Sequence, residues 1–171
     1  MDTKFAITKL EAARRQLETA IRLYFSEADP VSIHTLTLAA YDIIRNVSKK
    51  RGGSPMVIKD ELPELVNPKY KKMFRDKLNE AQNFFKHADR DADSTLRFCP
   101  AITEKMMWDA CEQYCKLTSE SPPLFRAYIA WFKALYPKVF DMSDEFARKA
   151  SHIAEAGRAG FLEDVLPLLS K

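Results

Sequence analysis

Apolar side chains recur three and four residues apart along most of this chain, and that spacing restricts the possible fold more than any other feature. In residues 4–27 the positions Leu10, Leu17, Ile21 and Tyr24 follow it, which places them on one face of an amphipathic helix. Only four glycines occur in the 171 residues, and a sheet protein rich in tight turns needs more. The pattern therefore predicts an all-α protein.

Prolines, glycines and short polar stretches divide this periodicity into about six to seven helices. A chain of this length fits one domain, and 46% hydrophobic with 30% charged residues is an ordinary globular composition. We expect an antiparallel helical bundle in a single domain, residues 1–171, with a main bundle at about 4–119 and C-terminal helices at 122–170 packing on it. The expected helices cover residues 4–27, 31–50, 68–88, 100–117, 124–135, 143–156 and 161–169, with a connector at 56–66.

Charge and hydropathy exclude several classes of protein. The formal net charge of +3 is too small to indicate nucleic-acid binding without local patches. No apolar run approaches the ~20 residues that span a bilayer, so we expect a cytoplasmic protein without membrane contact.

The three cysteines have no spacing typical of a disulfide framework and are expected as reduced thiols. No cofactor is expected.

The helix at residues 31–50 has two faces that are not plainly solvent-exposed. One is an aliphatic core face. The other carries His34, Leu38, Tyr41 and Arg45, spaced four, three and four residues apart, so their side chains form one stripe. Such a helix is typical of the centre of a bundle or of a dimer interface.

Aromatic side chains dominate residues 124–135 and the position just after them. Few polar residues separate them, so this helix is predicted to be buried in the core or to pack on a second copy of the chain. These aromatic side chains are Phe125, Tyr128, Trp131, Phe132 and Tyr136.

A second stripe, on the helix at residues 68–88, is polar. Asp76, Glu80, Asn83 and His87 are spaced four, three and four residues apart and border an apolar stripe that we expect to face the core. The residues of that apolar stripe are Tyr70, Met73, Phe74, Leu78, Ala81, Phe84, Phe85 and Ala88. A partly desolvated imidazole beside an amide suits general acid–base chemistry, so His87 and Asn83 are the expected catalytic residues. The alternative is a structural histidine that interacts favourably with the helix C-terminus.

Further charged and polar residues lie next to this stripe in the sequence and on the helix at residues 31–50. Cationic and hydroxyl side chains of this kind bind a phosphate group, or the charged ones pair with one another. The expected ligand-binding residues are Lys86, Asp89, Arg90, His34, Tyr41 and Arg45.

The acidic segment after His87 does not form a calcium loop. Ser94 stands where the sharp turn of an EF-hand needs glycine, and Pro100 stands where the bidentate glutamate belongs. A two-histidine metal site, His34 and His87 with Asp89 or Glu80, remains an alternative. Our expectation is that no metal is bound.

Residues 82–87, which read QNFFKH, resemble the arginine, polar residue and histidine signature of HEPN domains. Asn83 and His87 match the asparagine and histidine of that signature, whereas Gln82 replaces its arginine. The block at 83–91 also resembles short, uncharacterised bacterial helical proteins. HEPN domains are all-helical bacterial and archaeal modules, often dimers with the motif helix at the interface, and often metal-independent ribonucleases.

The resemblance implies a homodimer that binds RNA or a phosphorylated ligand in a polar cleft around His87. A ribonuclease would also need a cation in place of the missing arginine, from Arg14, Arg45 or Arg90. The second hypothesis is a non-enzymatic interaction or scaffold protein that forms a homodimer through the aromatic face.

Overall fold

The computed structural model describes residues 4–89, 92–140, 155 and 157–169, which form helices and loops without a strand among them. The all-α prediction is confirmed. None of the helices in these ranges has the length and apolarity needed to cross a membrane. Apart from residue 155, the helix expected at 143–156 lies outside the described residues. The helices are α1 (Lys9–Phe25), α2 (Pro30–Lys50), α3 (Leu62–Leu65), α4 (Lys71–Lys86), α5 (Ala101–Thr118), α6 (Pro123–Leu135) and α8 (Gly157–Leu169), with a π-helical turn η1 (Val57–Glu61) and a 3₁₀ turn η2 (Pro68–Tyr70).

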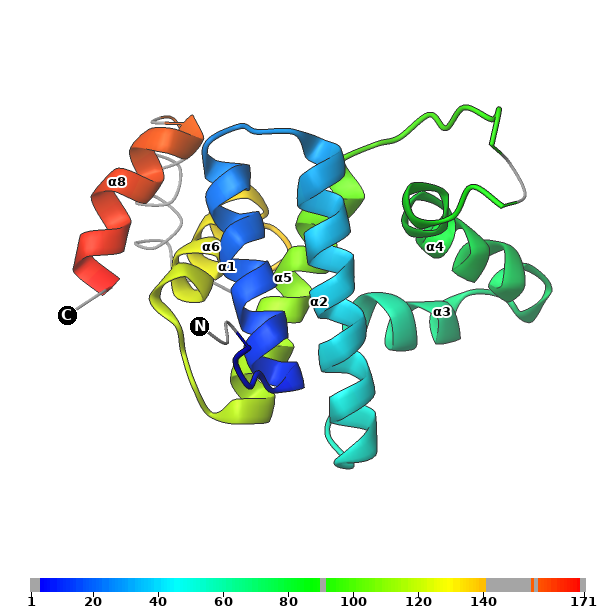
Figure 1. Ribbon diagram of the computed structural model, residues 1–171, viewed down its shortest axis with the longest axis horizontal. Coiled ribbons are helices and arrows are strands. Elements are labelled where there is room, and N and C mark those ends of the chain that lie inside the picture. The colour runs from blue at the N-terminus through cyan, green and yellow to red at the C-terminus, as the bar shows by residue number, and fades with distance from the viewer. Residues whose placement is uncertain (1–3, 90–91, 141–154, 156, 170–171) are drawn as a thin grey trace.

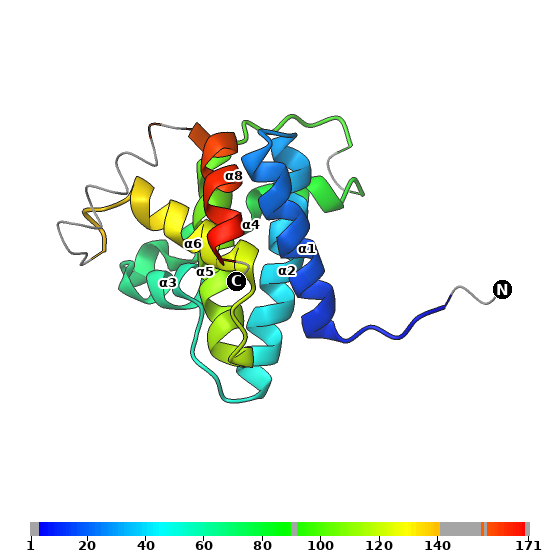
Figure 2. The same ribbon diagram turned by 90° about the vertical axis from the view of Figure 1, so that its left-hand side faces the viewer.

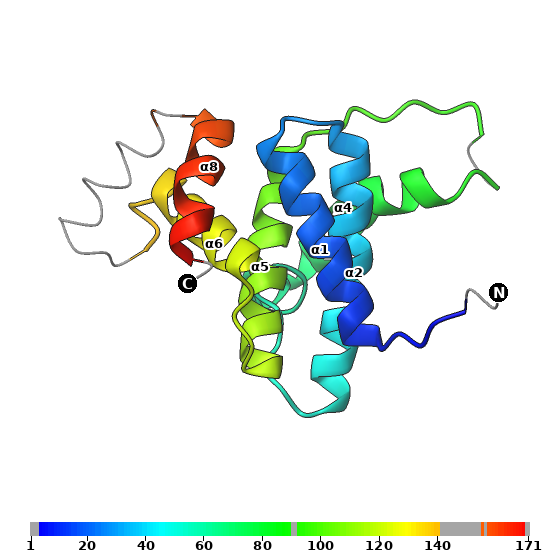
Figure 3. The same cartoon turned by 60° about the vertical axis from the view of Figure 1, so that its left-hand side comes forward.

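The helices form a bundle with a projecting arm (Figure 1). In the bundle α1 packs on α2, α2 on α5, and α5 on α6, while α8 packs against α6 and α1. The arm consists of α3, η2 and α4, and it lies on the side of α2 away from α6 and α8 (Figure 3). Figure 2 shows the chain before α1 running away from the bundle. The polar stripe predicted from the sequence therefore lies on the arm.

Side-chain caps decide where the first two helices begin. The Thr8 side chain accepts a hydrogen bond from the Glu11 backbone N–H at 3.1 Å, so α1 starts at Lys9 and not near residue 4 as expected. The Asp29 side chain accepts from the Ser32 N–H at 2.7 Å and starts α2. Each cap satisfies a backbone donor that the first helical turn leaves without a partner.

Helix α2 is central in the bundle. Its two faces that are not solvent-exposed predicted either this position or a dimer interface. Ile33 and Ala40 are buried on the aliphatic face, and Leu38 and Tyr41 on the second face are fully buried. Helix α2 packs on α1 and α5. On its second face, His34 and Tyr41 contact α5, and the Tyr41 hydroxyl also contacts η1. Both faces of α2 are thus occupied within one chain.

Most of the aromatic face of α6 is covered within the chain, as the core alternative for this helix predicts. Phe125, Tyr128, Trp131 and Phe132 are each at most 5% exposed. The Trp131 indole N–H donates to the Tyr24 hydroxyl on α1 at 3.1 Å, and Phe161 of α8 packs on the same indole. Of the five aromatic side chains, Tyr136 is the one that is half-buried, so α1, α5 and α8 leave little of this face for a second copy.

Helix α4 also differs from the prediction. Its apolar stripe was expected to face the core, but Gln82 is the only residue of α4 that is buried. Met73 is 59% exposed, Tyr70 just before the helix is 45% exposed, and Phe84 is half-buried. The arm touches the bundle mainly through α2, where Leu78 packs on the core and Phe85 packs on His34. The exposed part of the stripe is therefore the end that carries Tyr70 and Met73.

Candidate functional site

A surface groove of about 1130 Å³ runs along α4 and the chain that follows it. We call it the α4 groove. Its lining combines three lysines and three carboxylates with apolar side chains. The cations are Lys69, Lys72 and Lys77, the carboxylates are Asp76, Glu80 and Asp89, and the apolar residues include Met73, Phe84 and Leu96. The formal charges of these six ionised groups cancel.

The two predicted catalytic residues both line the α4 groove and are both exposed. His87 caps the C-terminus of α4, where its backbone N–H donates to the Asn83 carbonyl at 3.0 Å. Its backbone is extended there, so the imidazole leaves the helix at the end of the groove. The groove therefore brings together Asn83, His87 and Asp89 from the prediction.

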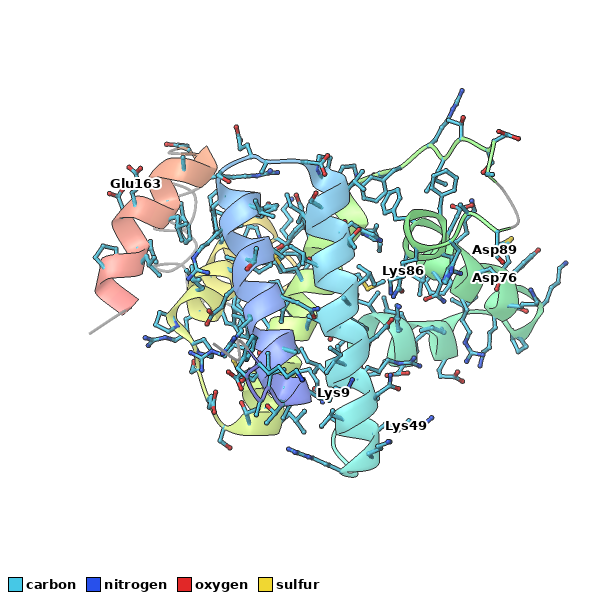
Figure 4. All side chains as sticks on the ribbon, viewed as in Figure 1. Lys9, Lys49, Asp76, Lys86, Asp89 and Glu163 are labelled. Carbon is cyan, nitrogen blue, oxygen red and sulfur yellow. The ribbon has the colours of Figure 1, made fainter. Side chains whose placement is uncertain are left out.

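Other predicted residues lie elsewhere. Lys86 lies on the side of α4 that faces α2, opposite Asp76 and Asp89 (Figure 4). Arg90 lies outside the described residues. Because the described lining of the α4 groove includes neither side chain, the expected cluster of cations around His87 is not assembled from these neighbours in the sequence.

Gln82, at the position where the HEPN signature has arginine, faces α2 and is 6% exposed. Its side-chain carbonyl accepts from the Lys59 ammonium at 2.8 Å, and its amide N–H donates to Asp42. The Lys59 ammonium also contacts Asp42 at 3.1 Å. This triad joins the arm to η1 and α2. Gln82 is therefore hydrogen-bonded to Lys59 and Asp42 and does not reach the groove.

His34 is enclosed and does not approach solvent. It is 1% exposed, its Nδ1 lies 2.8 Å from the Thr103 hydroxyl, and the rings of Phe85 and Phe98 pack edge-to-face on it. Burial, reinforced by the positive charges of Lys59 and Lys86, lowers the pKa of His34 to about 4. The imidazole is therefore neutral near pH 7 and holds α2, α4 and α5 together.

The described residues contain no group of three or more His, Cys, Asp or Glu side chains placed to hold a metal ion. His34 is turned toward Thr103 inside the fold, whereas His87 is exposed at the end of α4. The alternative of a two-histidine metal site has no geometric support in this part of the chain.

Tyr41 belongs to a buried network that fixes the connector. Its hydroxyl donates to Asp109 at 2.6 Å and accepts from the Lys59 backbone N–H at 3.2 Å. Asp109 also accepts from the backbone N–H groups of Val57 and Ile58 at 3.1 and 2.9 Å. Burial raises the pKa of Asp109, and these three hydrogen bonds oppose that shift. Tyr41 thus anchors η1 instead of contacting a ligand.

Arg45 lies at a second, smaller cavity of about 220 Å³ between α2 and the arm. It donates two hydrogen bonds to Asp60, whose other oxygen accepts from the Met56 backbone N–H at 3.0 Å. Burial opposes ionisation of Asp60, but the bonds from Arg45 and Met56 lower its pKa below the usual value. Arg45 is therefore separate from the groove that holds His87.

The three groove lysines were missed in the sequence. Lys72 precedes Asp76 by four residues, and Lys69 precedes Lys72 by three, so the same helical spacing that relates Asp76, Glu80, Asn83 and His87 extends back to them. The three- and four-residue spacing toward the start of the helix therefore predicts these lysines on the same stripe. By contrast, no local pattern predicts that Gln82 meets Lys59.

Comparison of the chain with family models, with curated proteins and with solved structures gives no match. Any assignment of function therefore depends on the geometry described above.

Proposed function

We propose that the protein is a non-enzymatic helical interaction protein that forms a homodimer through the α4 groove. The observation that carries this proposal is the exposed apolar surface at the start of α4, where Met73 of the groove is 59% exposed and Tyr70, just before the helix, is 45% exposed. Leu65 of the same arm is 83% exposed. An amphipathic helix whose apolar side is left uncovered is a typical protein-binding surface.

The order of residues along α4 favours a second copy of the chain as the partner. Met73 and Phe84 stand equally far from the middle of Lys71–Lys86, and so do Lys77 and Glu80. Two copies of α4 packed antiparallel about a twofold axis would place Met73 on Phe84 and Lys77 beside Glu80, twice each. A self-complementary surface of this kind is what an isologous dimer requires.

The charges at the two ends of the groove are also complementary. Lys69 and Lys72 line it at the start of α4, whereas Asp89 lies beyond its end. An antiparallel pair brings the basic end of one copy near the acidic end of the other. Because the groove has no excess of either sign, a partner with both signs fits better than a polyanion.

Sedimentation at increasing protein concentration tests the proposal. We expect a concentration-dependent shift from monomer to dimer, and we expect Met73→Glu to abolish it because a carboxylate replaces the apolar side chain that would meet Phe84. Val31→Glu is the matched control, since Val31 is also an exposed apolar residue, at 40%, but lies at the start of α2. A wild-type chain that stays monomeric at every concentration would refute the homodimer.

RNA or phosphate binding by a HEPN-like domain is the second candidate function. It is supported by Asn83 and His87, which line one groove together with lysines. In the antiparallel dimer, Lys72 of a second copy would approach His87 and supply a cation that Gln82 does not. A ribonuclease would use His87 to remove the ribose 2′-OH proton and that cation to stabilise the phosphorane.

Fluorescence anisotropy with a labelled single-stranded RNA, followed by gel analysis of the same RNA, tests this second candidate. If the groove binds RNA, His87→Ala and Lys72→Ala each weaken binding, and loss of cleavage in His87→Ala identifies a nuclease. Arg22→Ala, on the exposed side of α1, serves as the control for nonspecific charge. Equal binding by all four proteins would contradict an RNA site in the groove.

A further inference from the structure

Several cationic side chains converge on the cavity between α2 and the arm, which the function proposed above does not use. The cavity measures about 220 Å³, and its polar lining consists of Arg45, Lys59, Asp60, Glu64, Arg75 and Asn79. We infer that this cavity is a binding site for a small phosphate-type anion, either inorganic phosphate or the phosphate group of a small monoester.

The carboxylates at the cavity are already neutralised by hydrogen bonds. Asp60 accepts from Arg45 and from a backbone N–H, and Glu64 accepts from Lys71 at 2.6 Å and from Arg75 at 2.8 Å. Cationic partners lower the pKa of Glu64, led by the hydrogen bond from Lys71. An entering anion would therefore face carboxylates whose charge is compensated.

Cationic donors remain after these pairs are formed. Among the described residues, Arg45 uses only Nε and Nη2, both on Asp60, and Arg75 uses only Nη2, on Glu64. The remaining guanidinium N–H groups are available, and a guanidinium fork matches the oxygens of a phosphate group.

Lys59 supplies a buried ammonium group beside these two guanidinium groups, and although burial lowers its pKa, Asp42 opposes that shift. It is 8% exposed, and its ammonium donates to Asp42 and Gln82, which leaves one of its three N–H groups. The described lining of the cavity has three cations, Arg45, Lys59 and Arg75, against the two carboxylates of Asp60 and Glu64. The excess of one positive charge selects an anion.

The dimensions agree with a small ligand. A volume of about 220 Å³ corresponds to roughly seven water molecules at ~30 Å³ each, which accommodates one phosphate group with a few waters or a short organic substituent. The Asn79 amide, which donates one N–H to the Arg75 carbonyl at 2.8 Å, retains a second N–H that can donate to the ligand. A nucleic-acid strand would not fit.

Binding would connect two parts of the molecule. Arg45 and Lys59 belong to the bundle side, whereas Arg75 and Asn79 are on α4. An anion held by both sides would restrain the arm against α2. This inference does not depend on the homodimer, because the cavity lies apart from the residues that line the α4 groove.

Calorimetric titration of the full chain at pH 7 and constant ionic strength tests the site, with inorganic phosphate, methyl phosphate and chloride as separate titrants. We expect saturable binding of one or both phosphate compounds and none of chloride. Binding of inorganic phosphate alone would identify the free ion as the ligand, and tighter binding of methyl phosphate would identify a monoester.

Two variants locate the site. Arg75→Gln removes a guanidinium whose side chain is 54% exposed, so the fold is retained, and we expect about tenfold weaker phosphate binding from the loss of a charge-assisted hydrogen bond. Arg22→Gln on α1 is the matched control and should bind as the wild type does. Amide hydrogen exchange in α4 should slow when phosphate is added to the wild type.

The inference is overturned if the wild type binds phosphate no better than chloride. It is equally overturned if Arg75→Gln and Arg22→Gln bind phosphate with the wild-type affinity, because the anion would then occupy a different place.

Discussion

Helices α1 and α4 are both amphipathic, yet they bury different kinds of residue. In α1 the apolar face is enclosed, with Leu17 and Ile21 fully buried. In α4 the one buried residue is Gln82, and Met73 remains 59% exposed. The comparison shows that an apolar stripe predicts a helix but does not determine which element packs on that helix. In α1 the partner is the same chain, and for α4 we propose a second copy.

The largest effect should come from comparing truncations in the two helices. Leu17→Ala in α1 removes a fully buried side chain and should lower the free energy of unfolding by about 3 kcal/mol. Met73→Ala in α4 should change that of the monomer by less than about 0.5 kcal/mol, because the side chain is exposed. Urea denaturation at low protein concentration measures both. Equal losses would show that α4 is part of the core.

The contact between bundle and arm should depend on pH through His34. Its pKa is about 4 in the fold against an ordinary 6.5, so the unfolded chain takes up the proton first as the pH falls. Stability is retained above pH 6.5 and is lost between pH 6.5 and 4, by an amount on the order of 3 kcal/mol. The charged groups that act on the ring are Lys59 and Lys86.

Denaturation curves recorded at several pH values measure this dependence. His34→Gln should flatten the stability profile between pH 6.5 and 4, whereas His87→Ala should preserve it because His34 remains. A wild-type profile that is already flat in this range would contradict the burial of a neutral imidazole between α2 and α4.

A smaller effect should follow from Gln82, which holds the arm by hydrogen bonds. Gln82→Leu leaves the Lys59 ammonium with Asp42 alone and should cost about 1–2 kcal/mol. Faster amide exchange throughout α4, with little change in α1, would identify the arm as the part that loosens. Asn83→Leu is the adjacent control on the exposed side of the helix and should have little effect on stability.

Periodicity and capping residues were enough to predict most of the helices. The spacing of Leu10, Leu17 and Ile21 located α1, and Asp29 with Pro30 located the start of α2. The helix at residues 68–88 was also recognised, although only part of its apolar stripe packs on the bundle, through Leu78 and Phe85, and Met73 is exposed. Spacing defines the face of a helix, whereas burial depends on which other elements lie nearby.

The candidate site was predicted only where its residues share one helix. Asn83 and His87 were expected together and do line one groove. His34 and Tyr41 were expected to join them, but they bind Thr103 and Asp109 on α5. Those contacts join residues more than 60 positions apart, and the sequence contains no local pattern that specifies them.

The central claim is that two copies of α4 pack antiparallel, and a charge exchange between Lys77 and Glu80 tests it most directly. Lys77→Glu places two carboxylates against each other at the proposed interface, and Glu80→Lys places two ammonium groups there. Each variant alone should be monomeric by sedimentation. An equimolar mixture should form a heterodimer, because the two carboxylates of one variant would then each meet an ammonium group of the other.

Each variant carries two like charges at positions 77 and 80 of its own α4, and mixing does not change that. A dimer that forms only on mixing must therefore result from contacts between the two chains. The measurement is therefore sedimentation of the two variants alone and mixed, at one total protein concentration. The account predicts dimers only in the mixture. A mixture that stays monomeric, or single variants that dimerise like the wild type, would contradict it.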